Sequence, residues 1–512
     1  MDKGLQKIFA VAAVMILLTV SVGVLEYTKD EDALNTNPLG VISRVNTEGS
    51  SIFIADSELE HLSEEMTKKT GEKWNLRPGD SLEGVLYEMG PDGVAKGINP
   101  DLWEKNVVGT PGKPTIQHKM IESFVKDMGL EFRMLVQGEE LRSGVVYYDA
   151  TLTGTSYWTQ STAMTMGTVW QPVCGDIEAI SDSEPRSATR IMSSAQMEPN
   201  HACCVIAGNV NYLDANADTV IRFLAGFVEA VDRVNDALDH KDTKTYADLV
   251  KLAVDKTQKK ESVVKSAMDE VIYTYGNMIG TSDTLLNPLN SLREDVAKLS
   301  NNFNKDGTFT PNTTTDKLGF SSTMEFGNAL VNDYYLSKAI ELVQKVKEDP
   351  TVMDNYEHSS INVVVINGDI HQITLHYGIA MEIFEKYKIT PNLSTAKNGG
   401  GIAKSILNGA ADVGFLGLPP AVINAANNQL VKKTMSTISG TVLDENKDVI
   451  PGAKVVFKTN TGDEITALTD VNGRYTMNVV VGTVGVLSAG DVGQDIQRVS
   501  GPMRVNFEGV SI

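Results

Sequence analysis

Asp369 and His371 are a carboxylate and an imidazole spaced closely enough to act together. They stand two positions apart in the stretch NGDIHQ, directly after an apolar run at 361–366. Such a pair can transfer protons, hydrogen-bond a polar ligand, or satisfy nearby backbone donors. Because the two residues follow the end of an expected strand, we interpret them as ligand-binding residues. The alternative is that they are loop residues whose side chains satisfy backbone N–H groups.

Two glycine-bearing loops could bind an anion through backbone N–H groups. KNGGG at 397–401 and GTPGKPT at 109–115 each precede a helical pattern. The first N–H groups of a helix have no partner within the helix and can face a guest, although a purely structural role would also explain the glycines. A nucleotide-binding P-loop needs GxxxxGK[ST], and Pro114 interrupts the junction between Lys113 and Thr115, so that role is not expected.

Three strand–helix pairs are expected to position the first of these loops and the Asp369–His371 pair. Apolar runs at 361–366, 391–395 and 413–416 each end at a break with glycine or proline, or with several polar residues, and a helical pattern follows each one. This alternation predicts parallel β-α units, in which the carboxyl ends of the strands meet at one edge of a sheet. Ligands bind at that edge in open α/β folds.

The stretch from NGDIHQ to KNGGGIAKSILNGAADVGFLGLPPAV resembles the first lobe of ABC-transporter solute-binding proteins of the nitrate/sulfonate/taurine type. GTPGKPT resembles the loop that opens their second lobe, and NTEGSS at 46–51 resembles the polar segment near the hinge. Since the first lobe would stand at 361–432, after the other segments, the resemblance implies a circular permutation. Exchange of lobes between two chains is a variant of this arrangement, and a truncated second copy is the alternative.

The resemblance implies an α/β fold of the two-lobed periplasmic-binding-protein type II. A small polar or anionic molecule (sulfonate, nitrate, taurine or pyrimidine-like) would enter between the lobes, and an ABC transporter permease would recognise the closed form. The implied ligand-binding residues are Asp369, His371, Asn398, Gly399, Gly400, Gly417, Asn46, Ser50, Thr110, Gly112, Thr115 and Trp170. Closure is expected to bring Asn398 and Gly399 opposite Thr110 and Thr115.

Composition and charge limit the classes of partner and the cellular location that we expect for this chain. A formal net charge of -21 argues against nucleic acid, because binding to phosphate backbones needs clustered Lys and Arg. Residues 8–25 carry no charge and follow Lys3 and Lys7, which predicts a retained single-pass membrane helix with the rest of the chain on the extracytoplasmic side. Residues 57–106 are polar with several Pro and Gly breaks, and we expect a surface insertion there.

The last part of the chain changes character. Short alternating strands from 437 to 512, with Asn472-Gly473 as a hairpin turn signal, resemble the carboxypeptidase regulatory-like domain, a small β-sandwich. The expected organisation is therefore a membrane anchor and tether at 1–36, the second lobe with hinge strands and closing helices at 37–355, the first lobe at 356–433, and the sandwich at 434–512.

Catalysis is not expected from this sequence. The histidines are scattered along the sequence, and neither HExxH nor G-x-S-x-G occurs. The sequence around the adjacent Cys203 and Cys204 predicts packed side chains of a buried strand rather than metal-binding or redox residues. We therefore expect no cofactor and no metal. The alternative to solute transport is a membrane-anchored surface protein with a sensory or adhesive role; an enzyme on the outer face is a more remote one.

Overall fold

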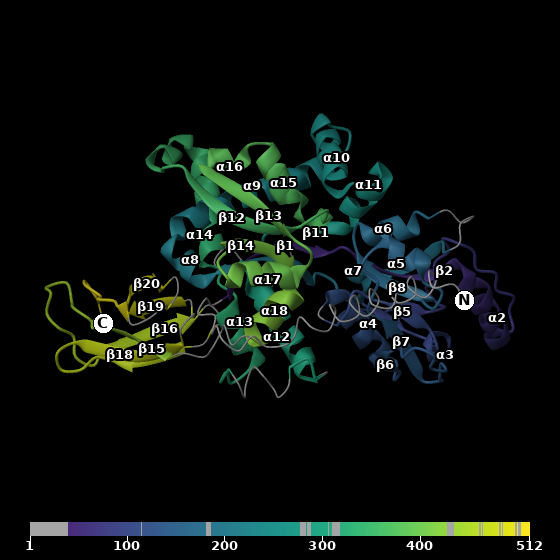
Figure 1. The fold of residues 1–512 in the computed structure, drawn as a ribbon. Coiled ribbons are helices and arrows are strands. Elements are labelled where there is room, and N and C mark those ends of the chain that lie inside the picture. The colour runs from purple at the N-terminus through teal and green to yellow at the C-terminus, as the bar shows by residue number, and fades with distance from the viewer. Residues whose placement is uncertain are drawn as a thin grey trace, which may run out of the picture. The chain divides into compact units, whose positions relative to one another are not determined.

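A computed structural model of the chain shows a mixed α/β fold (Figure 1). The chain divides into residues 1–36 and 37–512. The structure describes residues 39–511 except 114, 181–185, 277–282, 284–287, 306, 310–317, 428–434, 460–461, 463, 481–482, 484, 497–498 and 500–502. The predicted membrane helix at 8–25 and its tether lie outside the described residues. None of the described helices has the length and apolar character to cross a membrane.

The first six-stranded sheet draws its strands from distant parts of the sequence, in the order β11-β1-β10-β14-β12-β13. Three of them, β12 (Ser359–Ile366), β13 (Ile389–Ala396) and β14 (Val413–Gly417), pair in parallel. The antiparallel β10 (Ala202–Asn209) joins β14 to β1 (Leu39–Glu48), and β11 (Val271–Tyr273) completes the edge. The three predicted strand runs at 361–366, 391–395 and 413–416 are thus present and share one sheet.

The second six-stranded sheet lies within residues 50–193 and has the order β6-β7-β5-β8-β2-β9. β5 (Val107–Gly109) pairs in parallel with both β7 (Val145–Asp149) and β8 (Met166–Trp170). β6 (Glu131–Met134) extends this parallel set, whereas β2 (Ser50–Ala55) runs antiparallel to β8 and to β9 (Ala188–Ser193). The strand that ends at the first residue of GTPGKPT and the strand that begins within NTEGSS therefore belong to the same sheet.

Two connections join the sheets. At the first, β1 ends at Glu48 and β2 begins at Ser50, so Gly49 alone separates a strand of one sheet from a strand of the other. Gly49 has φ +85°, and a Cβ there would lie 2.6 Å from Nε2 of His371, so both the backbone angle and the space require glycine. The second connection runs from β9 through α7 (Ser194–Met197) to β10.

Long amphipathic helices cover the first sheet. The main one, α9 (Ala217–Asp239), packs against α14 (Tyr334–Glu348), α15 (Ile373–Ala380) and α16 (Ile383–Lys386). Further buried residues of the same core cluster come from four more helices, α10 (Lys244–Thr257), α11 (Glu261–Glu270), α12 (Asn290–Lys305) and α13 (Thr323–Leu330). Phe223, Phe227 and Phe415 form the aromatic centre of this cluster.

Three local predictions need correction. The glycines of KNGGG are not a loop before the helix, because α17 (Gly399–Leu407) begins at Gly399 with Asn398 as its N-cap. α18 (Leu418–Asn427) likewise begins inside the break with glycine and proline that the sequence predicts before the helix, since proline is tolerated in the first helical turn. Residues 57–106 hold α2 (Leu59–Thr70), β3 (Tyr87–Met89), β4 (Ala95–Gly97) and α3 (Pro100–Trp103), and they contribute Leu62, Leu86 and Trp103 to the core of the second sheet.

The C-terminal strands form a small sandwich of two sheets with its own apolar core. One sheet pairs β15 (Met435–Thr441) with β18 (Arg474–Val480) and β21 (Met503–Arg504). The other contains β16 (Lys454–Thr459), β17 (Glu464–Leu468), β19 (Gly485–Ala489) and β20 (Val492–Ile496).

The turn at Asn472-Gly473 does not close a hairpin as predicted. It joins β17 of one sheet to β18 of the other, and the carboxylate of Asp470 holds it by accepting the N–H groups of Asn472 (2.8 Å) and Arg474 (2.9 Å). The sequence correctly indicated a tight turn, because Gly473 has φ +67°. A turn signal does not reveal whether the strands on its two sides pair with each other.

Candidate functional site

A cavity of about 630 Å³ is lined by residues that follow strands of both sheets. From the first sheet come Asn367, Gly368 and Asp369 after β12 and Lys397 after β13, and from the second sheet Trp170 at the end of β8. We call this the Trp170 cavity. Its complete lining is Thr153, Gly154, Trp170, Pro172, Val173, Asp255, Lys256, Thr257, Gln258, Lys259, Ile366, Asn367, Gly368, Asp369 and Lys397.

Positive charge outweighs negative charge in the Trp170 cavity. Its lysines are Lys256, Lys259 and Lys397, against the carboxylates of Asp255 and Asp369. Lys259 forms an ion pair with Asp176, and Asp369 is matched by His371. Lys256 and Lys397 are exposed. Their ammonium groups can therefore bind a small polar or anionic ligand without disrupting a buried ion pair.

The turn after β12 holds Asp369 in a fixed orientation. Its Oδ1 accepts the backbone N–H of His371 (3.0 Å) and lies 2.8 Å from Nδ1 of the same residue. The side-chain amide of Gln372 donates to Oδ2 (3.3 Å), and its Oε1 accepts the N–H of Ile366 (3.1 Å), which ties the turn to the strand. Both Asp369 and His371 are buried.

The charge on His371 follows from these neighbours. Burial alone would lower its pKa, but the carboxylate of Asp369, the sulfur of Cys203 and the backbone of Gly49 together raise the pKa to about 9. The raised pKa favours the cationic imidazolium at neutral pH, and Asp369 and His371 form a buried ion pair. Of the two, only Asp369 lines the Trp170 cavity.

Trp170 provides the aromatic wall of the cavity. It ends β8, where it pairs with Ser50 of β2, and its side chain is half-buried. The next residue, Gln171, donates through its side-chain amide to Glu270 of α11 (2.8 Å), which ties this end of the second sheet to a helix of the first. A half-buried indole at a cavity wall can stack on a planar guest or cover an apolar one.

The polar groups of the GTPGKPT loop, which the sequence predicts to face a ligand, make hydrogen bonds within the loop and to α4 (Ile116–Asp127). The Thr110 hydroxyl is completely buried, lies 2.9 Å from Nδ1 of His118 and accepts the N–H of Gly112 (3.2 Å). Thr115 caps α4 by accepting the N–H of His118, and its hydroxyl donates to the carbonyl of Gly112 (2.7 Å). Thr110, Gly112 and Thr115 are thus partners of one another and of α4, and none of them lines the Trp170 cavity.

The remaining predicted residues lie outside the cavity lining. Asn398 is exposed and caps α17 through the N–H of Gly401 (2.9 Å), Gly399 abuts Pro420, Gly400 is exposed, and Gly417 pairs with Cys204. Asn46 donates to carbonyls of its own strand, and Ser50 accepts the side-chain amide of Gln117 (2.9 Å). Trp170 and Asp369 are therefore the predicted residues that the structure brings together in this cavity.

A second cavity of about 650 Å³ includes Ile116 of α4, Leu418 of α18, and His201 beside β10. It lies next to two of the predicted loops but is lined by none of the predicted site residues. In neither cavity do Asn398 or Gly399 face Thr110 or Thr115. The Trp170 cavity is the better candidate because it lies at the carboxyl ends of the parallel strands β12 and β13.

The prediction from sequence missed the segment between α10 and α11 as a cavity wall. Thr257, Gln258 and Lys259 line the cavity beside Asp369, and Gln258 has φ +58° where α10 ends. A helix end between two amphipathic patterns carries no motif, so no signal in the sequence pointed to it. Lys397, the first residue of the KNGGG stretch, does line the cavity.

Comparison with known proteins identifies the C-terminal part. Residues 437–498 match the carboxypeptidase regulatory-like domain, which confirms that prediction. No curated protein sequence matches this chain.

Three solved structures illustrate the structural similarities. A DUF3823 family protein from Parabacteroides merdae has 15% identity, covers 15% of this chain and 46% of its own, and gives a TM-score of 0.13. BcpA, the major pilin subunit of Bacillus cereus, has 18% identity, covers 15% and 30%, and gives 0.14. The periplasmic nitrate-binding protein NrtA from Synechocystis has 10% identity, covers 61% and 69%, and gives 0.37. This chain thus spans less than half the length of the first two, and none of these likenesses assigns a function.

Proposed function

We propose that this chain is an extracytoplasmic solute-binding protein. A small polar or anionic molecule, of the sulfonate, nitrate, taurine or pyrimidine-like class, binds in the Trp170 cavity, hinge closure buries it, and an ABC transporter permease accepts the closed form. The role is one of binding rather than catalysis. The family resemblance of the sequence, with the first lobe permuted to 361–432, supplies the link to transport.

One observation carries the proposal: a single cavity is lined by the carboxyl ends of β12 and β13 and by Trp170 at the end of β8. Strands that stand about 320 residues apart, β1 and β12, belong to one sheet, which is the arrangement that a permuted first lobe requires. Gly49 and the segment around α7 are the two places where the chain passes between the sheets, and they are the natural hinge.

The test is a binding screen on the full chain in detergent. Nitrate, taurine, alkanesulfonates and pyrimidines are each titrated while thermal unfolding and tryptophan fluorescence are followed. We expect one class to raise the melting temperature, because a ligand at 100 times its Kd stabilises the folded state by about 2.7 kcal/mol. The same ligand should change the fluorescence of Trp170, whose indole lines the cavity.

Two variants place the ligand. Trp170→Ala should weaken binding roughly 10-fold through loss of aromatic contact, and Lys397→Met should weaken binding of an anion but not of a neutral pyrimidine. The matched controls are Trp74→Ala, a partly buried tryptophan on the second sheet's cluster, and Lys447→Met, an exposed lysine of the sandwich. Equal loss in a variant and its control would contradict the assignment.

The alternative is a membrane-anchored surface protein that keeps the binding fold and has a sensory or adhesive role. The carboxypeptidase regulatory-like domain at 437–498 favours it, since that sandwich is appended to the two-sheet body. No thermal response to any of the compounds would favour this alternative, and turnover of one of them would point instead to an enzyme.

A further inference from the structure

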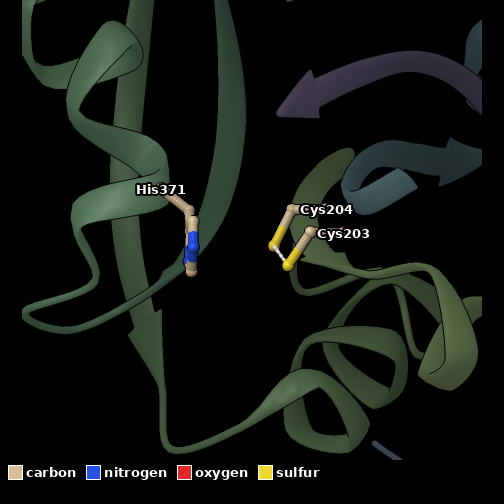
Figure 2. Close-up of side chains that lie close together, drawn as sticks. All are labelled: Cys203, Cys204 and His371. Carbon is tan, nitrogen blue, oxygen red and sulfur yellow. Dashed lines mark hydrogen bonds between the residues drawn. The ribbon is translucent and has the colours of Figure 1, made fainter. Parts of the chain in front are cut away.

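Cys203, Cys204 and His371 converge at a point that the proposed ligand cavity does not include. One ligand atom of each residue lies within 4.8 Å of the others, and all three side chains are buried. Figure 2 shows the imidazole opposite the two sulfur atoms. The cysteines come from β10 and the histidine from the turn after β12, two elements separated along the sheet by β14.

Adjacent residues of a regular strand point to opposite faces of the sheet, so two neighbouring cysteines would normally diverge. Here the register is irregular. Asn46 of β1 pairs with Cys204 and Thr47 pairs with Ala202, which leaves Cys203 as the extra residue of a bulge. A bulge re-aims a side chain, and the two sulfur atoms consequently lie 3.9 Å apart.

This separation fits a metal ion bound by both sulfurs. Two Zn–S bonds of ~2.3 Å at a tetrahedral angle place their sulfur atoms ~3.8 Å apart. The pair therefore already has the spacing that tetrahedral coordination requires. The cysteines form no disulfide in the described part of the chain, so both thiols can give up their protons and become thiolate ligands when a metal binds.

The histidine is arranged as a metal ligand with an outer carboxylate. Its Nδ1 lies 2.8 Å from Oδ1 of Asp369, which fixes the ring and leaves Nε2 as the nitrogen open to a metal. Nε2 is buried and makes no hydrogen bond of standard geometry with any described residue. Buried polar atoms are rarely left without a partner, and a bound ion would supply one.

We propose that Cys203, Cys204 and His371 bind one thiophilic metal ion, Zn²⁺ or Cu⁺, with Asp369 as the residue that positions the imidazole. Two thiolates and an imidazole are the ligand set that such ions prefer over Mg²⁺ or Ca²⁺. Three protein ligands are one fewer than a closed structural zinc site has, so a fourth position is left for water or another small donor.

The experiment uses the full chain, reduced and stripped of metal with a chelator. Zn²⁺ is titrated in competition with a chromophoric chelator, and Cu⁺ in competition with a copper-specific one, which decides between the two ions. We expect one ion per chain. Co²⁺ in place of Zn²⁺ should give thiolate-to-cobalt charge-transfer bands and the visible bands of a tetrahedral ion.

Matched variants locate the ion. Cys203→Ser, Cys204→Ser and His371→Asn should each abolish the tetrahedral cobalt spectrum, and Asp369→Asn should weaken affinity roughly 10- to 100-fold. Cys174→Ser is the control for cysteine and His376→Asn the control for histidine, because both residues lie outside the cluster. Both controls should bind like the unmodified chain, and so should Trp170→Ala.

A measurement on the unmodified chain covers the case in which a cysteine variant fails to fold. Bound metal should protect Cys203 and Cys204, but not Cys174, from alkylation in mild denaturant, as read by mass spectrometry. Failure of both ions to bind, equal loss in Cys174→Ser, or unchanged alkylation of Cys203 and Cys204 would each overturn the proposal. Those results would leave the cysteines as packed side chains.

Discussion

Two turns of this molecule follow parallel strands and carry similar residues, yet they use them in opposite ways. The turn after β12 directs Asp369 to a cavity and its neighbour His371 to a pair of cysteines. In the loop after β5, the hydroxyls of Thr110 and Thr115 form hydrogen bonds with His118 of the following helix and with the backbone of the loop. The carboxyl edge of a parallel strand is thus a suitable place for a site, but it does not create one.

The difference lies in whether donors and acceptors balance locally. In the loop after β5, Thr110, Gly112 and His118 form a chain of matched partners. In the turn after β12, a buried carboxylate has to balance a cation. Nε2 of His371 and Nδ1 of His376 are buried and make no hydrogen bond of standard geometry to the described residues. Groups left over in this way are the ones available to a ligand or an ion.

The largest effect that would test this contrast is expected from Asp369→Ala. Removing the carboxylate leaves the buried imidazole without its counter-ion, and loss of one partner of such a pair costs about 3 kcal/mol or more. Urea unfolding of the chelated chain measures it. The control is Asp149→Ala at the end of β7, a carboxylate that only caps its own turn through Thr151. An equal loss in both would remove the contrast.

The second effect is a pH dependence of stability that arises from His376, on the helix after the β12 turn. Burial, helped by Lys256 and opposed by Asp369, lowers the pKa of His376 to about 4 from 6.5. As the pH falls below 6.5, the imidazole of His376 becomes protonated in the unfolded chain at a higher pH than in the folded chain. Stability should therefore be complete above pH 6.5 and fall by about 3 kcal/mol as the pH drops to 4.

Comparison of the unmodified chain with His376→Gln over pH 4 to 7 isolates this contribution. The difference in free energy of unfolding between the two proteins should change with pH and become constant above pH 6.5. His240→Gln, at an exposed histidine, should give a difference that changes much less. A parallel shift of the two curves for His376→Gln would show that its burial does not exclude the charge.

A smaller loss is expected for Thr110→Val, which keeps the shape of the side chain but removes its hydroxyl. His118 and Gly112 each lose a hydrogen bond at a completely buried site, at a cost of about 2 kcal/mol. Ligand affinity should not change. Thr151→Val, at an exposed threonine, is the control for thermal unfolding. Weaker ligand binding by Thr110→Val would return this loop to the site.

The smallest effect is expected from the two helix caps, Thr115 of α4 and Asn398 of α17. Each accepts a backbone N–H in the first turn, so replacement by alanine should cost about 1 kcal/mol in either case. Neither variant should alter ligand affinity, because neither residue lines the Trp170 cavity. A change in affinity for Asn398→Ala alone would indicate that α17 moves toward the ligand on binding.

The strands of the parallel units could be predicted because their sequences are dominated by burial. Val363, Val364 and Val365 of β12 and Phe415 and Leu416 of β14 are buried, and such continuous apolar runs are typical of strands covered on both faces. Asp369 could be named because it follows an apolar strand, whereas Trp170 was named only through the family resemblance. The family resemblance supplied the order of the units, and the C-terminal sandwich was identified by its short alternating strands.

The rest depended on contacts that no single segment specifies. The bulge at Cys203 arises from pairing with β1, some 160 residues earlier, so the sequence around the cysteines predicts diverging side chains. Whether Thr110 faces a guest or His118 depends on how α4 leaves the loop. The helix starts at Gly399 and Leu418 were misplaced because glycine and proline usually break helices, yet both are accepted in a first turn.

The order of strands in the first sheet also has a consequence for synthesis of the chain. A ribosome that has passed residue 300 has delivered every strand of the second sheet, but only β1, β10 and β11 of the first. Until β14 emerges, β10 presents an unpaired apolar edge, which invites contact with other nascent chains. Chaperone demand should therefore peak late in translation and end only when residue 417 has left the exit tunnel.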